Sequence, residues 1–219
     1  MADLTAEKLD LRKQIISAAQ IYKRYLAGKV FLYVYGEESF EVAYLTECFK
    51  HLTGVESTLR GNSFYNNAKN ATLTTEQIGL SQRHPLRTAR KKLVCLHQLP
   101  QLTTDVVCVV KDMHTVSITY KLGISNLEFT VGLTENIDAA GNRINNWLIP
   151  RTLRINDKAI EASADAQFID MIFSKNAPDE LYSTVCYADL NVPVPSTILP
   201  LLDDALKTNL SVDHTLQPV

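Results

Sequence analysis

Residues 106–133 read VVCVVKDMHTVSITYKLGISNLEFTVGL, and this stretch sets the fold class. Every second residue from 116 to 122 is apolar, and the same alternation returns from 127 to 133. A period of two residues is typical of a strand with one buried face, and the short turn between the runs favours antiparallel pairing. Together with the apolar run at 106–110, the pattern predicts a three-stranded antiparallel meander.

The chain before this stretch has helical patterns around one hairpin. Residues 5–27 predict a long amphipathic helix that Gly28 ends. Its expected buried stripe is Leu9, Arg12, Ile16, Ala19, Tyr22 and Leu26. The apolar run 30–35 predicts a buried strand that pairs with residues 40–45. Proline suits the first turn of a helix, so Pro85 predicts another helix that runs to about Gln98.

Helices first and strands afterwards predict an α+β fold, in which N-terminal helices precede a mostly antiparallel sheet. Further strands are expected at 143–149, 167–174 and 181–187. We expect a single domain over residues 1–190. Residues 191–219 should then form an extension with a proline-containing linker, a short helix and a loose tail.

Composition and motifs exclude several classes of protein. Hydrophobic residues make up 46% and charged residues 21%, which is typical of a globular chain. The net charge of −2 gives no global attraction to nucleic acid, so any such attraction must be local. The four cysteines lack the spacing of zinc ligands, and we expect free thiols, with no metal or cofactor. No Walker loop, dinucleotide fingerprint, HExxH or GxSxG motif occurs.

The N-terminus has two acidic residues within its first seven and no apolar leader. A membrane-spanning helix would need about 18 uninterrupted apolar residues, and the chain has no such run. We therefore expect a cytoplasmic protein without membrane contact.

Short blocks along the chain carry a family resemblance. They are residues 18–23, 31–34, 48–54, 64–68, 93–96, 149–153 and 172–175, with the meander among them. In this order the blocks resemble a phage-associated family of barnase, EndoU, colicin and RelE-like nucleases. The resemblance implies a barnase/RelE-like fold and a metal-independent ribonuclease or ribonuclease toxin that cleaves RNA through 2′-OH attack in a bacterial or phage-infected cell.

The block Cys48-Phe-Lys-His-Leu-Thr-Gly54 contains the candidate proton-transfer residue. His51 aligns with the family's His-Leu-Thr-Gly block, and histidine suits proton transfer because its ordinary pKa is about 6.5. Lys50 beside it is a candidate for substrate binding. In the alternative interpretation, His51 only hydrogen-bonds a carbonyl while Leu52 packs inside. A second proton-transfer group has no motif, although Glu47 qualifies if residues 47–51 are helical.

Two further blocks offer phosphate ligands. Arg151 and Arg154 flank Thr152, and a guanidinium can hold two phosphate oxygens while a hydroxyl adds a third donor. Surface charges, with Thr152 capping a turn, are the alternative. Ser174 and Lys175 match another block of the family and are expected to complete the cationic site, unless Lys175 is a solvated strand end.

A basic ridge is expected on the helix that begins at Pro85. It consists of Arg83, Arg87, Arg90 and Lys91. Such a ridge could follow an RNA backbone, or be an ordinary solvated face. RNA is the expected partner, with an immunity or host-defence protein as a further one. The alternative function is a catalytically inactive phage protein that binds a host protein or nucleotide to inhibit host defence.

Overall fold

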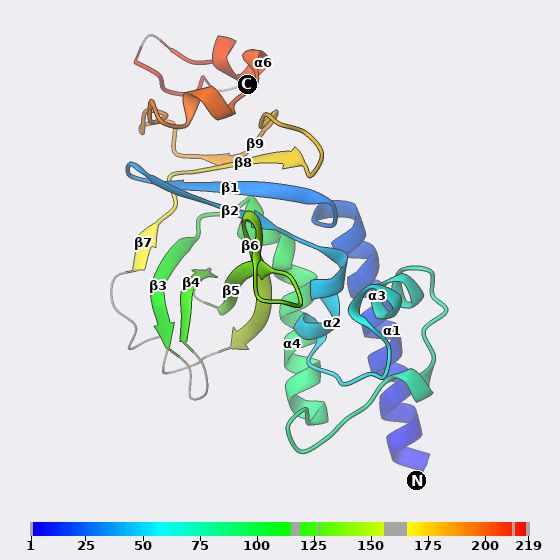
Figure 1. Cartoon of the computed structure of the whole chain (residues 1–219). Coiled ribbons are helices and arrows are strands. Elements are labelled where there is room, and N and C mark those ends of the chain that lie inside the picture. Colours follow the sequence, from blue (N-terminus) through cyan, green and yellow to red (C-terminus); the bar gives the residue numbers. More distant parts are fainter. Residues whose placement is uncertain (1, 115–118, 127, 156–165, 212, 218–219) are drawn as a thin grey trace.

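The computed structural model describes residues 2–114, 119–126, 128–155, 166–211 and 213–217 (Figure 1). Among them a nine-stranded sheet has the order β7-β3-β4-β5-β6-β2-β1-β8-β9. The strands are β1 (Lys29–Tyr35), β2 (Glu38–Ala43), β3 (Cys108–His114), β4 (Thr119–Ser125), β5 (Phe129–Ile137), β6 (Arg143–Ile155), β7 (Ala166–Phe168), β8 (Met171–Asn176) and β9 (Thr184–Ala188). The helices are α1 (Ala2–Tyr25), α2 (Phe49–Thr53), α3 (Gly61–Lys69), α4 (Leu86–Gln98) and α6 (Asp204–Thr208). Short 3-10 turns are η1 (Thr46–Cys48), η2 (Thr75–Gln77), η3 (Leu99–Thr103) and η4 (Leu199–Leu201).

The α+β prediction is confirmed. Strands β3, β4, β5 and β6 form an antiparallel meander, and β1 pairs antiparallel with both β2 and β8. The β2–β6 contact is parallel and consists of the single pair Val42–Leu148, so it joins the hairpin to the meander. Residues 116–118, the first part of the second expected strand, lie outside the described residues.

Helix α1 exists as predicted, and the second half of its expected stripe is buried, since Ala19, Tyr22 and Leu26 are at most 1% exposed. In the first half the buried side differs, because Leu9 is 44% exposed whereas Leu11 and Ile15 are fully buried. There the packing of α1 against α3 and α4 buries the neighbouring stripe. Gly28, at φ +80°, follows the end of the helix and permits the turn into β1.

Aromatic packing connects α1 to the segment that carries His51. The Tyr22 ring lies edge-on to Phe49, Tyr65 and Tyr44, with ring centroids 5.3, 5.8 and 6.2 Å away. Its hydroxyl donates a hydrogen bond to the Leu45 carbonyl at 2.9 Å. Edge-on aromatic contacts of this kind add to the free energy of burial. Together they hold η1 and α2 against the longest helix of the described chain.

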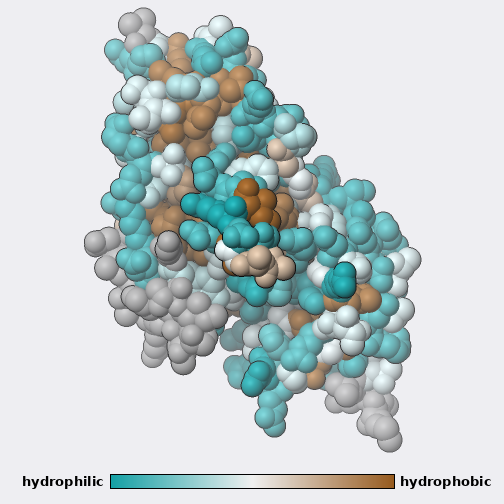
Figure 2. All heavy atoms as spheres, viewed as in Figure 1, coloured by the Kyte–Doolittle hydropathy of each residue, from teal (hydrophilic) through white to brown (hydrophobic). Residues whose placement is uncertain are grey.

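The C-terminal extension covers the other face of β1 and β8 (Figure 1). It contains the expected short helix, α6, but the tail differs from the loose segment that composition suggested. Leu202 is fully buried, Leu216 is 6% exposed, and both belong to the cluster that packs on Leu32 and Phe173. The side chains of β1 point alternately to its two faces, so one strand supports two cores. Figure 2 shows apolar side chains gathered along this extension.

Two smaller predictions are also confirmed. Helix α4 begins after Pro85 and ends at Gln98. Before it, Thr74 and Gln77 form a capping box around η2. The four cysteines are free. Within the described ranges, no helix has the length and apolar character needed to cross a membrane.

Candidate functional site

The location of His51 follows from a short helical segment. Turn η1 continues directly into α2, whose Phe49 and Leu52 side chains are fully buried. His51 therefore lies on the outer side of α2. The segment ends at Gly54, which has a left-handed backbone with φ +73°. A Cβ at Gly54 would lie 2.7 Å from Cδ of Lys92, so glycine lets α2 pack closely against α4.

A β-bulge presents Arg151 to this segment. Gly132 pairs with Thr152 and Leu133 pairs with Pro150, which leaves Arg151 as an extra residue in β6. Bulges interrupt the alternation of a strand and can change the direction of a side chain. The Arg151 Nη1 donates to Nε2 of His51 at 3.0 Å. Since a guanidinium cannot accept a hydrogen bond, Nε2 is unprotonated in this contact.

The surroundings of His51 favour its neutral form. Burial, as the largest cause, and the positive charges of Arg151, Lys50 and Lys92 together lower the pKa of His51 to about 4. They do so although His51 is partly exposed. At neutral pH the imidazole is therefore uncharged, and its Nε2 carries the lone pair that a general base needs.

Lys92 also belongs to this site, since its charge acts on His51, whereas the predicted basic ridge included only its neighbour Lys91. Burial lowers the pKa of Lys92 to about 8, and the charge of Arg154 acts in the same direction. The Lys92 ammonium has no hydrogen bond and no ion pair with any residue in the described ranges. One signal was available in the sequence, because Lys92 lies three residues after Ala89 and four before Leu96 on the apolar side of α4.

The other predicted residues of the two nearby blocks have different surroundings. The Lys50 ammonium donates to the Leu59 carbonyl at 2.7 Å, so it fixes the chain after α2 while adding charge near His51. Thr152 is 7% exposed, and strand alternation directs it away from the face that Leu153 shares with the helices. Residues 46–53 are helical, which was the condition for Glu47 to be the second proton-transfer group. However, the Glu47 carboxylate accepts a hydrogen bond from Asn62 at 3.5 Å.

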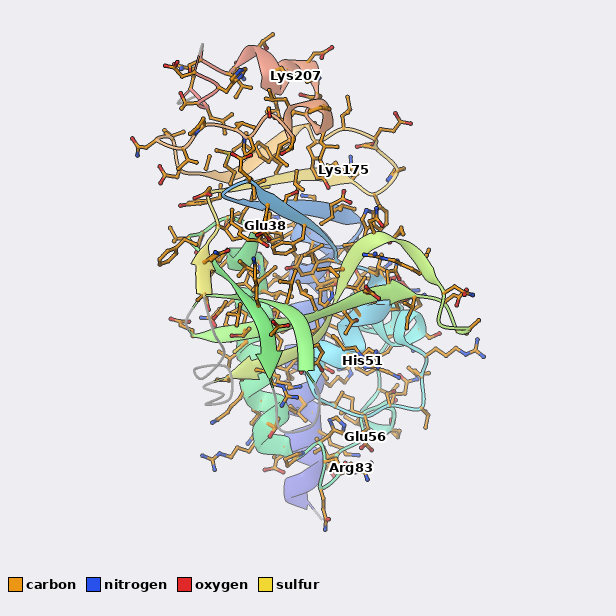
Figure 3. All side chains as sticks on the ribbon, turned by 60° about the vertical axis from the view of Figure 1, so that its left-hand side comes forward. Glu38, His51, Glu56, Arg83, Lys175 and Lys207 are labelled. Carbon is orange, nitrogen blue, oxygen red and sulfur yellow. The ribbon has the colours of Figure 1, made fainter. Side chains whose placement is uncertain are left out.

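Ser174 and Lys175 do not join His51. Both lie on β8, separated from β6 by β2 and β1. Three strand spacings amount to roughly 14 Å. The Lys175 ammonium donates to the Glu180 carbonyl at 3.0 Å and lies 3.8 Å from the Glu41 carboxylate. Figure 3 shows Lys175 and His51 in different parts of the molecule. The catalytic role of Lys175 stays a prediction without support from proximity to His51.

The predicted basic ridge is only partly formed. Arg83 precedes α4, while Arg87 and Lys91 are exposed on the helix. Arg90 faces α1 and lies 4.0 Å from the carboxylates of both Glu7 and Asp10. These acids offset its charge, so Arg90 contributes less to a surface that attracts phosphate.

The fold and the site together define a class of protein: an α+β chain in which a neutral histidine lies beside cations. The family described as phage-Barnase-EndoU-ColicinE5/D-RelE like nuclease4 has a model that matches residues 14–191. The chain belongs to this family, whose name indicates a nuclease of the barnase, EndoU and RelE type. No curated protein and no solved structure matches the chain significantly. In the part of the chain that is described, no cluster of three or more His, Cys, Asp or Glu side chains could hold a metal ion.

Proposed function

We propose that this protein is a metal-independent ribonuclease, of the toxin type found in phages and mobile elements, with its site around His51. The single observation that carries the proposal is the 3.0 Å contact between Arg151 Nη1 and His51 Nε2. It combines an unprotonated ring nitrogen with a cation that can bind phosphate. RNA is the proposed substrate, because cleavage without a metal can use its own 2′-OH as the nucleophile.

In the proposed first step His51 is the general base. Its Nε2 takes the proton of the 2′-OH, whose oxygen then forms a bond to the adjacent phosphorus. Arg151 releases Nε2 as the phosphate binds and turns its N–H groups to the phosphate oxygens. Because the guanidinium has five N–H donors, it can stabilise the negative charge that grows on the phosphate.

Lys92 is the proposed general acid. Its ammonium gives a proton to the leaving 5′-oxygen as the P–O bond breaks, which yields a 2′,3′-cyclic phosphate and a 5′-OH end. An amine with a pKa of about 8 remains protonated at neutral pH and is acidic enough to donate. Lys92 thus fills the role that no sequence motif assigned.

We propose that the RNA backbone is attracted by the side chains of Arg154, Arg87 and Lys91. Phosphate contacts from such side chains weaken as salt rises. An immunity or host-defence protein as a further partner stays a prediction.

The test is cleavage of a fluorescent RNA in EDTA, with the ends identified by mass spectrometry. We expect cyclic phosphate ends and a rate at least about 100-fold lower in His51→Gln, within the range for loss of a general base. Arg143→Gln, an exposed change at the start of β6, serves as the matched control. Intact RNA at enzyme excess would refute the proposal. Arrested growth on expression, relieved by His51→Gln, would support the toxin type.

The pH profile separates the two proton-transfer roles. The base must be unprotonated, so the rate should rise with pH through about 4, the pKa of His51. The acid must be protonated, so the rate should fall through about 8, the pKa of Lys92. In Lys92→Gln the alkaline fall should disappear and the maximal rate should drop. An unchanged alkaline limb in this variant would exclude Lys92 as the acid without affecting His51.

A further inference from the structure

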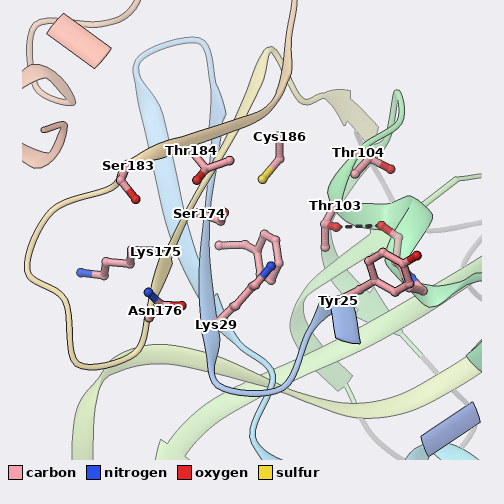
Figure 4. Close-up of a pocket in the computed structure, with 12 residues that line it drawn as sticks. Tyr25, Lys29, Thr103, Thr104, Ser174, Lys175, Asn176, Ser183, Thr184 and Cys186 are labelled. Atoms are coloured by element: carbon pink, nitrogen blue, oxygen red, sulfur yellow. Dashed lines mark hydrogen bonds between the residues drawn. The ribbon is translucent and has the colours of Figure 1, made fainter. Parts of the chain in front are cut away.

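A cavity lies away from His51, at the end of β1 where Lys29 stands. It has a volume of about 260 Å³ and opens between the end of α1, turn η3 and strands β1, β8 and β9 (Figure 4). Phe31 and Ser174, which are opposite each other in the β1–β8 register, are almost fully buried at its base. No step of the proposed RNA cleavage uses this cavity.

The cavity carries positive charge that the protein does not neutralise. Lys29 and Lys175 are the charged side chains among the residues that line it. The Lys175 ammonium is engaged by Glu41 and by the Glu180 carbonyl, and it lies 4.7 Å from the centre of the Tyr182 ring. Lys29 has no side-chain hydrogen bond or ion pair within the described ranges. Figure 4 shows the Lys29 side chain among the lining residues, with Lys175 extending away from it.

The other lining groups include several hydroxyls and an exposed aromatic ring. Thr184 pairs with Ser174 across the β8–β9 register, and Ser183 precedes it. Tyr25 stands at the edge with 43% of its surface exposed, and the Arg24 guanidinium lies 5.2 Å from the centre of its ring. A free ammonium suits an anion, hydroxyls suit phosphate and sugar oxygens, and an exposed aromatic ring offers a surface on which a base can stack.

We propose that this cavity binds a nucleoside monophosphate. In this arrangement Lys29 binds the phosphate, the hydroxyls of Thr184 and Ser183 contact phosphate or ribose, and the base stacks on Tyr25. The volume accepts a phosphate and a sugar, and the exposed ring lies where a base would leave the cavity. The site is separate from His51, so its existence does not depend on RNA cleavage.

The binding test is calorimetric titration of the full chain with 5′-AMP, ribose 5-phosphate and inorganic phosphate. We expect 5′-AMP to bind most tightly and Lys29→Met to weaken it about 10- to 100-fold, as for loss of a hydrogen bond to a charged group. Lys23→Met, an exposed change on α1 outside the cavity, should leave the affinity unchanged. Equal affinities for wild type and Lys29→Met would overturn the site, and inorganic phosphate binding as tightly as 5′-AMP would overturn the nucleotide assignment.

Two further variants keep the test decisive. Tyr25→Ala changes an exposed side chain and should weaken 5′-AMP while sparing ribose 5-phosphate; equal losses for both would refute base stacking. A nuclease site could also hold a phosphate, so the titrations are repeated in Arg151→Met. Retention of the Lys29-dependent binding there supports a separate site whether or not RNA is cleaved, whereas its loss assigns the binding to the His51 site and overturns the inference.

Discussion

Replacing Arg151 by methionine should raise the pKa of His51. The substitution removes one positive charge and the N–H that contacts Nε2 at 3.0 Å. Two unit charges about 4 Å apart interact by roughly 1 kcal/mol in water and 4 kcal/mol at an effective dielectric constant of 20. Because His51 is partly exposed, the lower interaction energy of roughly 1 kcal/mol applies. This energy corresponds to a pKa change of slightly less than one unit. Burial and the charges of Lys50 and Lys92 remain, so the pKa should stay below its ordinary value.

The assay is an NMR titration of the histidine ring protons, with the His51 signal assigned by its absence in His51→Gln. Arg143→Met is the matched control, since Arg143 lies on the same strand and bonds the Asn145 carbonyl. The pKa should rise in Arg151→Met and stay unchanged in Arg143→Met. An unchanged His51 pKa in Arg151→Met would refute the contact, and with it the electrostatic argument for a neutral base.

Three other substitutions test the packing of the protein and the extent of the site. Gly54→Ala should destabilise the protein more than Gly28→Ala in thermal unfolding. Both substitutions incur a left-handed backbone strain of about 1–2 kcal/mol, but only a side chain at position 54 would also clash with Lys92. Equal losses of stability would contradict the close packing of α2 on α4. Leu202→Ala should cost about 2–5 kcal/mol in denaturant unfolding and Leu201→Ala, 38% exposed, much less, and similar values would disprove the second core. Lys175→Met should retain RNA cleavage after correction for stability, and a loss as large as that of His51→Gln would restore Lys175 to the site.

Local patterns were sufficient to predict most elements of the fold. The alternation after residue 116 predicted the meander, and Pro85 predicted the start of α4. They did not predict which side is buried in the first half of α1, since apolar residues lie on two of its sides there and only contacts with α3 and α4 select one. They also missed the packing of Leu216, because its partners Leu32 and Phe173 are distant in sequence.

Sequence patterns were enough to indicate the family, the α+β order and the choice of His51 as a candidate proton-transfer residue. The cations near His51 depend instead on tertiary contacts. Arg151 reaches Nε2 because a register shift between β5 and β6 leaves it as an extra residue, and such a shift belongs to two strands rather than to one. Lys92 lies near His51 because Gly54 allows α2 to pack closely on α4. Lys175 lies away from the site because strands β1 and β2 separate β8 from β6. Residue types are local properties, but the proximity of His51 and Arg151, which are 100 residues apart, is set by strand pairing and helix packing.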